Sequence, residues 1–148
     1  MNICLYGASS TELDRRYLDA AYDLGCRIAE GGHTMIYGGG AQGVMGAAAR
    51  GVVEHNGTLI GVAPTFFKRA PGVLFGGCTE FIDTETMAER KTIMMQRADA
   101  FIMAPGGLGT YEEFFEVLTL KQLGRHNPAL AVLNTLNYYA PMQAMLEH

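Results

Sequence analysis

The chain has 148 residues, of which 49% are hydrophobic and 18% charged, and its formal net charge at pH 7 is -4. This length and apolar content favour one domain, residues 1–148, with a sizeable core. The small negative charge without a long Lys/Arg run argues against a nucleic-acid partner, and no apolar run approaches the roughly 18 residues of a membrane span.

Strand and helix patterns alternate along the whole chain. In chain order, the sequence predicts strand 2–6, helix 13–30, strand 34–37, helix 41–55, strand 58–63, strand 79–82, helix 87–97, strand 100–103, helix 110–123, strand 129–133 and helix 138–147. The stretch 64–77, rich in Phe, Gly and Pro, is irregular, and it is either a lid or a packed loop. The alternation predicts an α/β fold, a Rossmann-like, doubly wound parallel sheet with helices on both faces. Ligands of such sheets bind beyond the carboxyl ends of the strands.

The turn after the second strand is rich in glycine. Gly38-Gly39-Gly40-Ala41-Gln42-Gly43 satisfies G-x-G-x-x-G between a strand and a helix. A dinucleotide site also needs an acidic residue about 20 positions further on. The third strand ends in Gly61-Val62-Ala63-Pro64 without a carboxylate, so we exclude an NAD site, and the absence of Gly-Lys-Ser/Thr excludes a Walker-type ATP loop. A phosphate cradle at Gly39, Gly40 and Gly43 remains.

A second glycine turn follows the fifth strand. Pro105-Gly106-Gly107-Leu108-Gly109-Thr110 leads from an apolar run into an amphipathic helix. Free backbone N–H groups and the helix dipole favour an anion there. Two such turns at one edge of a small sheet are stronger evidence for a phosphate site than a single turn, although both could also be simple tight turns.

Two charged residues are candidates for chemistry beside these turns. Glu113 lies one helical turn after Thr110 and shares its face, whereas Glu112 and Glu116 fit a solvated first turn. Arg90 falls on one side of its helix, where a guanidinium could pair with a phosphate or a carboxylate. The alternative for Arg90 is an exposed charged helix.

Other chemistries have little support in the sequence. Three widely spaced cysteines form neither a disulfide framework nor a Cys-x-x-Cys site, and the four histidines lack ligand spacing, so we expect no metal and a reducing cytoplasm. Met1 leads straight into a strand, so we expect no signal peptide. Ser9 and Ser10 lack a Gly-x-Ser-x-Gly context, and no lysine is marked as desolvated.

Taken together, these segments resemble the Lonely Guy family of cytokinin-activating phosphoribohydrolases, many of which carry the older label "lysine decarboxylase-like". The resemblance runs from the first strand to about Tyr139. It rests on three motifs in order: Gly38-Gly39-Gly40-Ala41-Gln42-Gly43-Val44-Met45-Gly46, the Arg90-Lys91 pair after Met87, and Pro105-Gly106-Gly107-Leu108-Gly109-Thr110-Tyr111-Glu112-Glu113. Where the family's first turn usually reads Cys-Gly-Ser-Ser, this chain has Tyr6-Gly7-Ala8-Ser9-Ser10.

The resemblance implies a homodimer or higher homo-oligomer without a cofactor. It also implies hydrolysis of an N6-substituted adenosine 5′-monophosphate to free base and ribose 5-phosphate, with Arg90 and Glu113 as the catalytic pair. The substrate-contacting or phosphate-binding positions that it implies, together with the glycine turns above, are Ser9, Gly39, Gly40, Gly43, Met87, Lys91, Gly106, Gly107, Leu108, Gly109, Thr110 and Thr119.

Three other functions stay open at this point. One is a nucleotide-binding module without turnover, related in fold to molybdenum-cofactor carriers. Another is an amino-acid decarboxylase, which would need pyridoxal phosphate. The last is hydrolysis of unmodified AMP.

Overall fold

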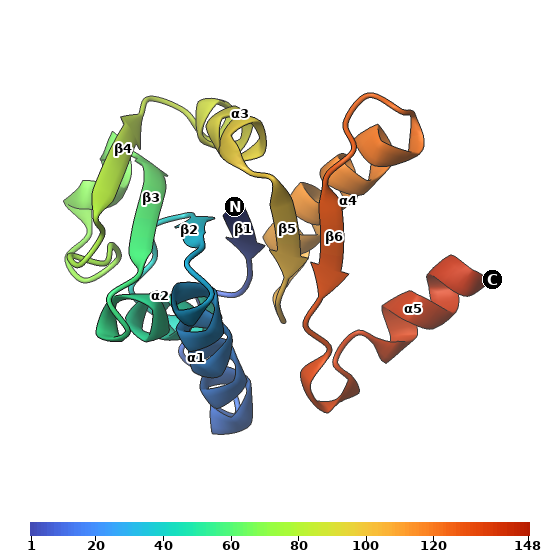
Figure 1. The fold of residues 1–148 in the computed structure, drawn as a ribbon, viewed down its shortest axis with the longest axis horizontal. Helices are drawn as coiled ribbons and strands as arrows, with labels where there is room; N and C mark the ends of the chain where they lie inside the picture. Colours follow the sequence, from blue (N-terminus) through green and yellow to red (C-terminus); the bar gives the residue numbers. More distant parts are fainter.

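The computed structural model describes all 148 residues. Six parallel strands form one sheet in the order β4-β3-β2-β1-β5-β6 (Figure 1). Their bounds are β1 Asn2–Tyr6, β2 Thr34–Tyr37, β3 Thr58–Pro64, β4 Glu80–Thr84, β5 Ala100–Met103 and β6 Ala129–Val132. The predicted doubly wound α/β fold is therefore confirmed, including the parallel pairing of every neighbouring pair of strands.

Helices cover both faces of this sheet. On one face lie α1 (Arg15–Glu30) and α2 (Gly43–Glu54), and on the other lie α3 (Met87–Arg97), α4 (Leu108–Gln122) and α5 (Ala140–Glu147). The division follows from strand geometry, because successive side chains point to opposite faces. Ile3 and Leu5 pack with the first pair of helices, whereas Cys4 and Tyr6 pack with the other three.

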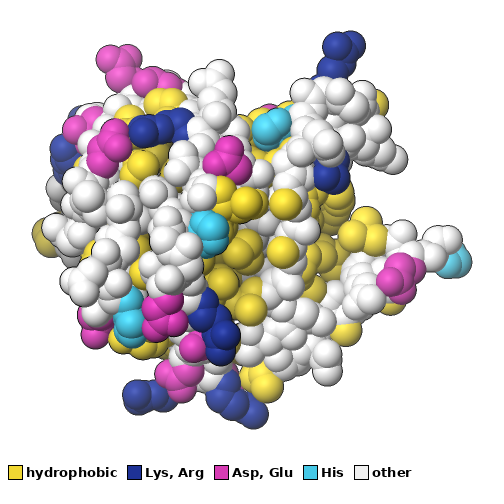
Figure 2. All heavy atoms as spheres, in the orientation of Figure 1, with side chains coloured by type: hydrophobic (Ala, Val, Ile, Leu, Met, Phe, Trp, Pro, Cys, Tyr) yellow, Lys and Arg dark blue, Asp and Glu magenta, His cyan; other side chains and the backbone are white.

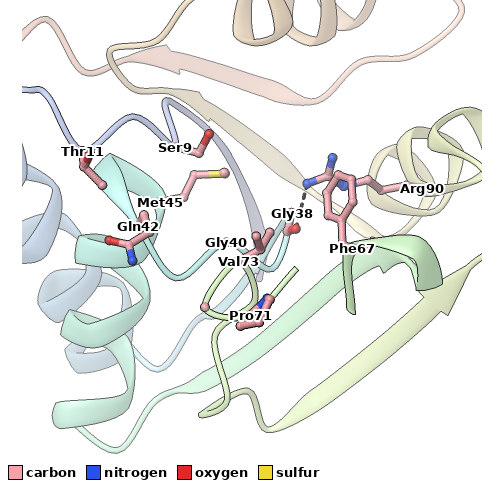
Figure 3. A pocket seen from close by; sticks show the side chains of 11 residues that line it. Ser9, Thr11, Gly38, Gly40, Gln42, Met45, Phe67, Pro71, Val73 and Arg90 are labelled. Carbon is pink, nitrogen blue, oxygen red and sulfur yellow. Dashed lines mark hydrogen bonds between the residues drawn. The ribbon is translucent and has the colours of Figure 1, made fainter. Parts of the chain in front are cut away.

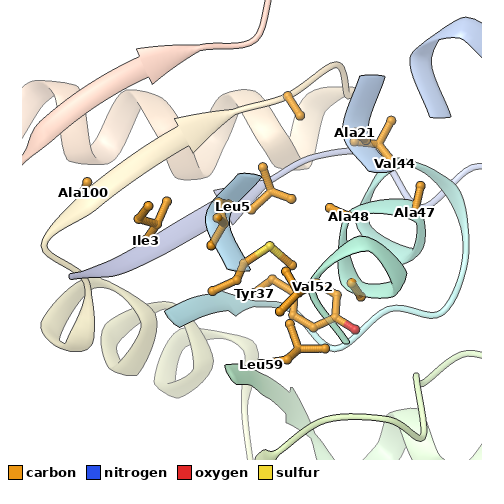
Figure 4. Packing of buried hydrophobic residues seen from close by; sticks show 14 residues of the cluster. Ile3, Leu5, Ala21, Tyr37, Val44, Ala47, Ala48, Val52, Leu59 and Ala100 are labelled. Carbon is orange, nitrogen blue, oxygen red and sulfur yellow. The ribbon is translucent and has the colours of Figure 1, made fainter. Parts of the chain in front are cut away.

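The core beneath α1 and α2 depends on small residues (Figure 4). A Cβ atom at Gly25 would lie 2.1 Å from the carbonyl oxygen of Ala48, and one at Gly51 would lie 2.2 Å from that of Tyr22. The two helices therefore approach each other backbone to backbone. This contact holds α2, and with it the glycine turn that precedes α2, against the sheet.

The order of the strands creates a crevice at the carboxyl edge. From β1 the chain moves outward through β2, β3 and β4, and then returns to place β5 on the other side of β1. The loops after β1 and β5 therefore leave in opposite directions, which is where open α/β sheets bind ligands. The Ala8 N–H donates to the Pro105 carbonyl over 3.0 Å, so the two loops are joined at this point.

The ends of several elements differ from the prediction by about two residues. The helix predicted from Leu13 begins at Arg15, because the Asp14 carboxylate caps it by accepting from the Arg16 N–H. The helix predicted from Thr110 begins at Leu108, with Gly107 as its N-cap residue. Glycine and leucine carry no capping signal here, so the sequence alone places this start too late.

In the irregular stretch 64–77, Pro64 ends β3, a 3₁₀ turn spans Thr65–Arg69, and most of the residues are exposed. Its later part pairs with the glycine turn after β2, because Ala41 donates to Val73 over 2.9 Å and Phe75 donates to Gly39 over 2.8 Å. A second 3₁₀ turn, Thr135–Asn137, precedes α5. No helix of the protein combines the length and apolar character that crossing a bilayer requires.

Candidate active site

Three loops meet at the carboxyl edge of the sheet. The loop after β1 is tied to the loop after β5 through Ala8 and Pro105, and the Met45 N–H of α2 donates to the Ala8 carbonyl over 3.3 Å. The loop after β2 turns sharply, with Gly39 at φ +81° and Gly43 at φ +67°, which a side chain would strain. The sequence prediction that both glycine turns lie at one edge is confirmed by this arrangement.

The N-terminus of α4 is open to a ligand. Gly107 gives α4 no side-chain cap, so the first N–H groups of the helix lack intrahelical partners. A Cβ atom at Gly107 or Gly109 would find nothing within 4 Å, so no other part of the chain crowds these two residues on that side. Unpaired N–H groups and the positive end of the helix dipole together favour an anion such as a phosphate.

Two tyrosines that the sequence analysis did not single out hold this turn in place. The Tyr138 hydroxyl donates to the Gly106 carbonyl and the Tyr139 hydroxyl donates to the Ala104 carbonyl, each over 2.6 Å. Gly106 is also sterically required, since a Cβ atom there would lie 2.2 Å from the Thr110 hydroxyl oxygen. The two tyrosine hydroxyls and the close packing of Gly106 against Thr110 therefore hold this turn in place without a ligand.

Arg90 is buried, with 9% of its surface exposed. Its Nε–H donates to the Val62 carbonyl over 2.9 Å, and its Nη2 donates to the Gly38 carbonyl over 2.7 Å. A Cβ atom at Gly38 would lie 1.7 Å from Nη2, so only glycine permits this approach. Burial lowers the pKa of the guanidinium, and the Glu113 carboxylate opposes that effect. The alternative of an exposed charged helix is wrong for Arg90.

Glu113 lies on the first turns of α4 and is partly buried. Burial raises the pKa of its carboxyl from 4.5 to about 7, while the positive charge of Arg90 acts in the opposite direction. A cavity of about 270 Å³ is lined by both of these residues together with Met87, Ala88, Lys91, Gly109 and Glu112. Glu113 is therefore a carboxyl group near half ionisation at neutral pH, in reach of the α4 N-terminus and next to a buried cation. Perturbed groups of this kind mark functional sites.

A larger cavity of about 470 Å³ adjoins Arg90 on its other side (Figure 3). The loop after β1, the glycine turn after β2 and the loop 64–77 enclose it. Its lining residues are Ser9, Thr11, Gly38, Gly40, Gln42, Met45, Phe67, Pro71, Gly72, Val73 and Arg90. Arg90 lines both cavities, so it lies at the boundary between them.

The remaining predicted residues divide into two groups. Ser9 lines the larger cavity, and Met87 and Lys91 line the smaller one. The Lys91 amine, however, is paired with the Glu112 and Glu116 carboxylates of α4, the second over 2.6 Å. Leu108 and Thr119 line neither cavity, and the Leu108 side chain is 89% exposed.

Known proteins resemble this chain over most of its length. Residues 45–148 match the family model described as "Possible lysine decarboxylase". A cytokinin riboside 5′-monophosphate phosphoribohydrolase from Rhodococcoides fascians is 41% identical over 90% of this chain and 67% of its own length. The Arabidopsis thaliana enzyme of the same name, LOG2, is 36% identical over 98% of this chain and 68% of its own length. The chain thus spans about two thirds of the length of these curated relatives.

Among solved structures, the molybdenum cofactor carrier protein from Chlamydomonas reinhardtii is similar to this fold. It superimposes with a TM-score of 0.78 at 25% sequence identity, covering 99% of this chain and 84% of its own. The two curated relatives, at 41% and 36% identity, are more similar to this chain in sequence than this structure is, at 25%. The chain therefore belongs to the family of the cytokinin riboside 5′-monophosphate phosphoribohydrolases.

Proposed function

We propose that this protein hydrolyses the N-glycosidic bond of an N6-substituted adenosine 5′-monophosphate, releasing the free base and ribose 5-phosphate. The observation that carries the proposal is the Glu113 carboxyl, whose pKa is raised to about 7, on the helix whose N-terminus is an open anion site. The names of the two curated relatives support the same reaction.

In this proposal the 5′-phosphate binds at the N-terminus of α4. The N–H groups of the stretch 107–110 donate to the phosphate oxygens, and Ser9 borders the same crevice from the loop after β1. Gly40 lines the larger cavity, and Gly39 and Gly43 let the opposite wall pack closely, since a Cβ atom at Gly43 would lie 2.6 Å from the Ala8 carbonyl oxygen and one at Gly39 would lie 3.1 Å from the Phe81 ring. Lys91 lines the smaller cavity, but its amine is paired with the Glu112 and Glu116 carboxylates, so the backbone N–H groups are the main phosphate donors in this proposal.

The Glu113 carboxylate acts at the anomeric carbon. Cleavage of the bond between C1′ and the purine nitrogen builds positive charge on the ribose, as in glycoside hydrolysis. A carboxylate beside C1′ stabilises that charge and orients the water whose oxygen forms the new bond to C1′. The leaving nitrogen of the base takes up a proton, so atoms and charges balance. Arg90 orients the ribose and keeps part of Glu113 ionised, because its positive charge lowers the pKa of that carboxyl.

The direct experiment is chromatographic. The pure protein is incubated separately with N6-isopentenyl-AMP and with AMP, and free base is separated and quantified. Release from the modified nucleotide supports the proposal, while release from AMP alone keeps the mechanism and changes the substrate. No release from either nucleotide contradicts it.

A second candidate is a nucleotide or molybdenum-cofactor binding module, which the likeness to the Chlamydomonas carrier favours. The combination of a buried Arg90 with a Glu113 carboxyl near half ionisation argues for turnover, because binding an anionic ligand does not require that carboxyl. Tight binding of AMP without base release would favour this module.

A pyridoxal-phosphate decarboxylase is disfavoured by the surroundings of the three lysines. Lys91 pairs with two carboxylates, Lys68 lies 2.8 Å from the Asp83 carboxylate, and Lys121 donates to the Asn127 and Pro128 oxygens. None of the three lines the larger cavity. A colourless protein that does not bind pyridoxal phosphate would agree with this reading.

We further propose that the protein is a cytoplasmic homodimer. The support is an apolar groove of about 360 Å³ beside the edge strand β6, lined mainly by Val132, Tyr139, Met142 and Leu146. Figure 2 shows hydrophobic side chains gathered in the hollow between β6 and α5. The three cysteines are free thiols, which fits a reducing compartment. Light scattering on the purified protein tests the dimer.

A further inference from the structure

The Arg90 guanidinium lies over an aromatic ring. The Phe67 ring centroid lies 5.4 Å from the Arg90 Cζ atom, and Figure 3 shows the ring beside the guanidinium. Phe67 belongs to the 3₁₀ turn that follows β3, and β3 also supplies the Val62 carbonyl that accepts from Arg90. One continuous segment of chain thus contacts Arg90 both through the Val62 carbonyl and through the Phe67 ring.

The two kinds of contact leave one edge of the guanidinium for other partners. Nε and Nη2 donate in plane to backbone carbonyls, whereas the polar contact of Nη1 is the Met87 thioether at 3.7 Å, a weak acceptor. Nη1 therefore keeps donor capacity on the Met87 side, where the cavity lined by Glu113 lies. An aromatic ring holds a guanidinium through its face without using any of these donors.

The segment that carries Phe67 is itself anchored. Val73 and Phe75 hydrogen-bond to the glycine turn after β2, which also supplies the Gly38 carbonyl to Arg90. The Phe66 ring packs edge-on against Phe67, with 5.0 Å between the ring centroids. Phe66 is 43% exposed and lines neither of the two cavities.

We propose that Phe67 is a positioning residue: its ring packs against the Arg90 guanidinium, excludes water there, and holds the free Nη1 edge toward Glu113 and the substrate. This role rests on the proposed function insofar as Arg90 acts in the reaction. The loop 64–77 then contributes to catalysis through Arg90, and it does so from a position that has no counterpart in the three sequence motifs.

The test compares Phe67→Leu, Phe67→Tyr and the matched control Phe66→Leu. Leucine keeps an apolar side chain but removes the ring, whereas tyrosine keeps the ring. We expect Phe67→Leu to lower kcat about tenfold with less than threefold change in KM, which corresponds to about 1.4 kcal/mol of lost transition-state stabilisation. Phe67→Tyr should restore most of the wild-type kcat, and Phe66→Leu should leave kcat within twofold of wild type.

A second measurement does not depend on turnover. In ¹⁵N-labelled protein, the Arg90 Nε–H should exchange with water at least tenfold faster in Phe67→Leu than in wild type, with no such change in Phe66→Leu. An unchanged exchange rate, or equal losses of kcat at Phe66 and Phe67, would overturn the inference. If the wild-type protein releases no base, the proposed function fails, and the exchange rates still decide whether Phe67 shields Arg90.

Discussion

Replacing Glu113 with glutamine should make the protein more stable above neutral pH. The carboxyl is partly buried and its pKa is raised from 4.5 to about 7, because burial penalises the charged form more than Arg90 stabilises it. Glutamine has a similar shape and no charge, so the substitution removes that penalty. Groups that serve catalysis at the expense of folding are expected at active sites.

The sign and size of the effect follow from linkage. Below pH 4.5 the Glu113 carboxyl is protonated in both the folded and the unfolded chain, so its burial carries no charge penalty and does not lower the free energy of unfolding. Between pH 4.5 and about 7 the unfolded chain loses its proton first, and stability falls as the pH rises. Above pH 7 the full penalty is present, and this shift corresponds to about 3 kcal/mol as an upper bound.

Urea denaturation at pH 5 and at pH 8 measures this difference. Glu113→Gln should raise the free energy of unfolding by about 1–3 kcal/mol at pH 8 and by less than about 1 kcal/mol at pH 5. Glu12→Gln, at an exposed carboxylate, serves as the control and should show no such pH dependence. Equal stability of Glu113→Gln and wild type at pH 8 would refute the account of a desolvated carboxyl.

Three further outcomes follow from the same geometry. If the carboxylate is the active form, kcat/KM should fall about tenfold for each pH unit below about 7 and level off above it, whereas a flat pH profile of kcat/KM from 5 to 8 would exclude Glu113 as the titrating group. Gly38→Ala should lower kcat at least about tenfold and lower the free energy of unfolding by about 1–3 kcal/mol, because the new Cβ atom displaces Nη2 of Arg90. Gly107→Ala is the control: its Cβ atom meets nothing within 4 Å, so the free energy of unfolding should change by less than about 0.5 kcal/mol. Tyr6→Phe should leave the stability of the protein unchanged or raise it by up to about 1 kcal/mol in thermal unfolding, since the buried Tyr6 hydroxyl has no hydrogen-bond partner. A loss of stability above about 1 kcal/mol would show that the hydroxyl does have a partner.

The parts of the fold that the sequence predicts well are those encoded locally. Apolar runs such as 100–103 and the helical spacing around Phe114 depend on neighbours within one or two turns, and both elements are present in the structure. The handedness and strand-order rules of parallel sheets then bring the two glycine turns to one edge. The start of α4 was placed two residues late because Gly107 and Leu108 give no capping signal.

The support of the site, by contrast, is formed by residues far apart in the chain. Arg90 reaches the Gly38 carbonyl across 52 positions, and the hydroxyl of Tyr139 reaches the Ala104 carbonyl across 35. No periodic pattern reports such contacts. The raised pKa of Glu113 likewise depends on how α4 packs over the sheet, which the spacing from Thr110 does not reveal. The pairing of Lys91 with two carboxylates of α4 is equally invisible in the motif that contains it.

The most direct test of the central claim is turnover by Glu113→Gln measured together with its nucleotide affinity. Wild-type protein and the variant are compared for release of free base from N6-isopentenyl-AMP, and their affinities for AMP are measured by calorimetry. We expect kcat to fall about 100-fold or more while the affinity for AMP changes less than about threefold, since the phosphate binds to the backbone of α4 and not to this carboxylate. Wild-type turnover in Glu113→Gln would contradict the assignment of Glu113 as the catalytic carboxylate.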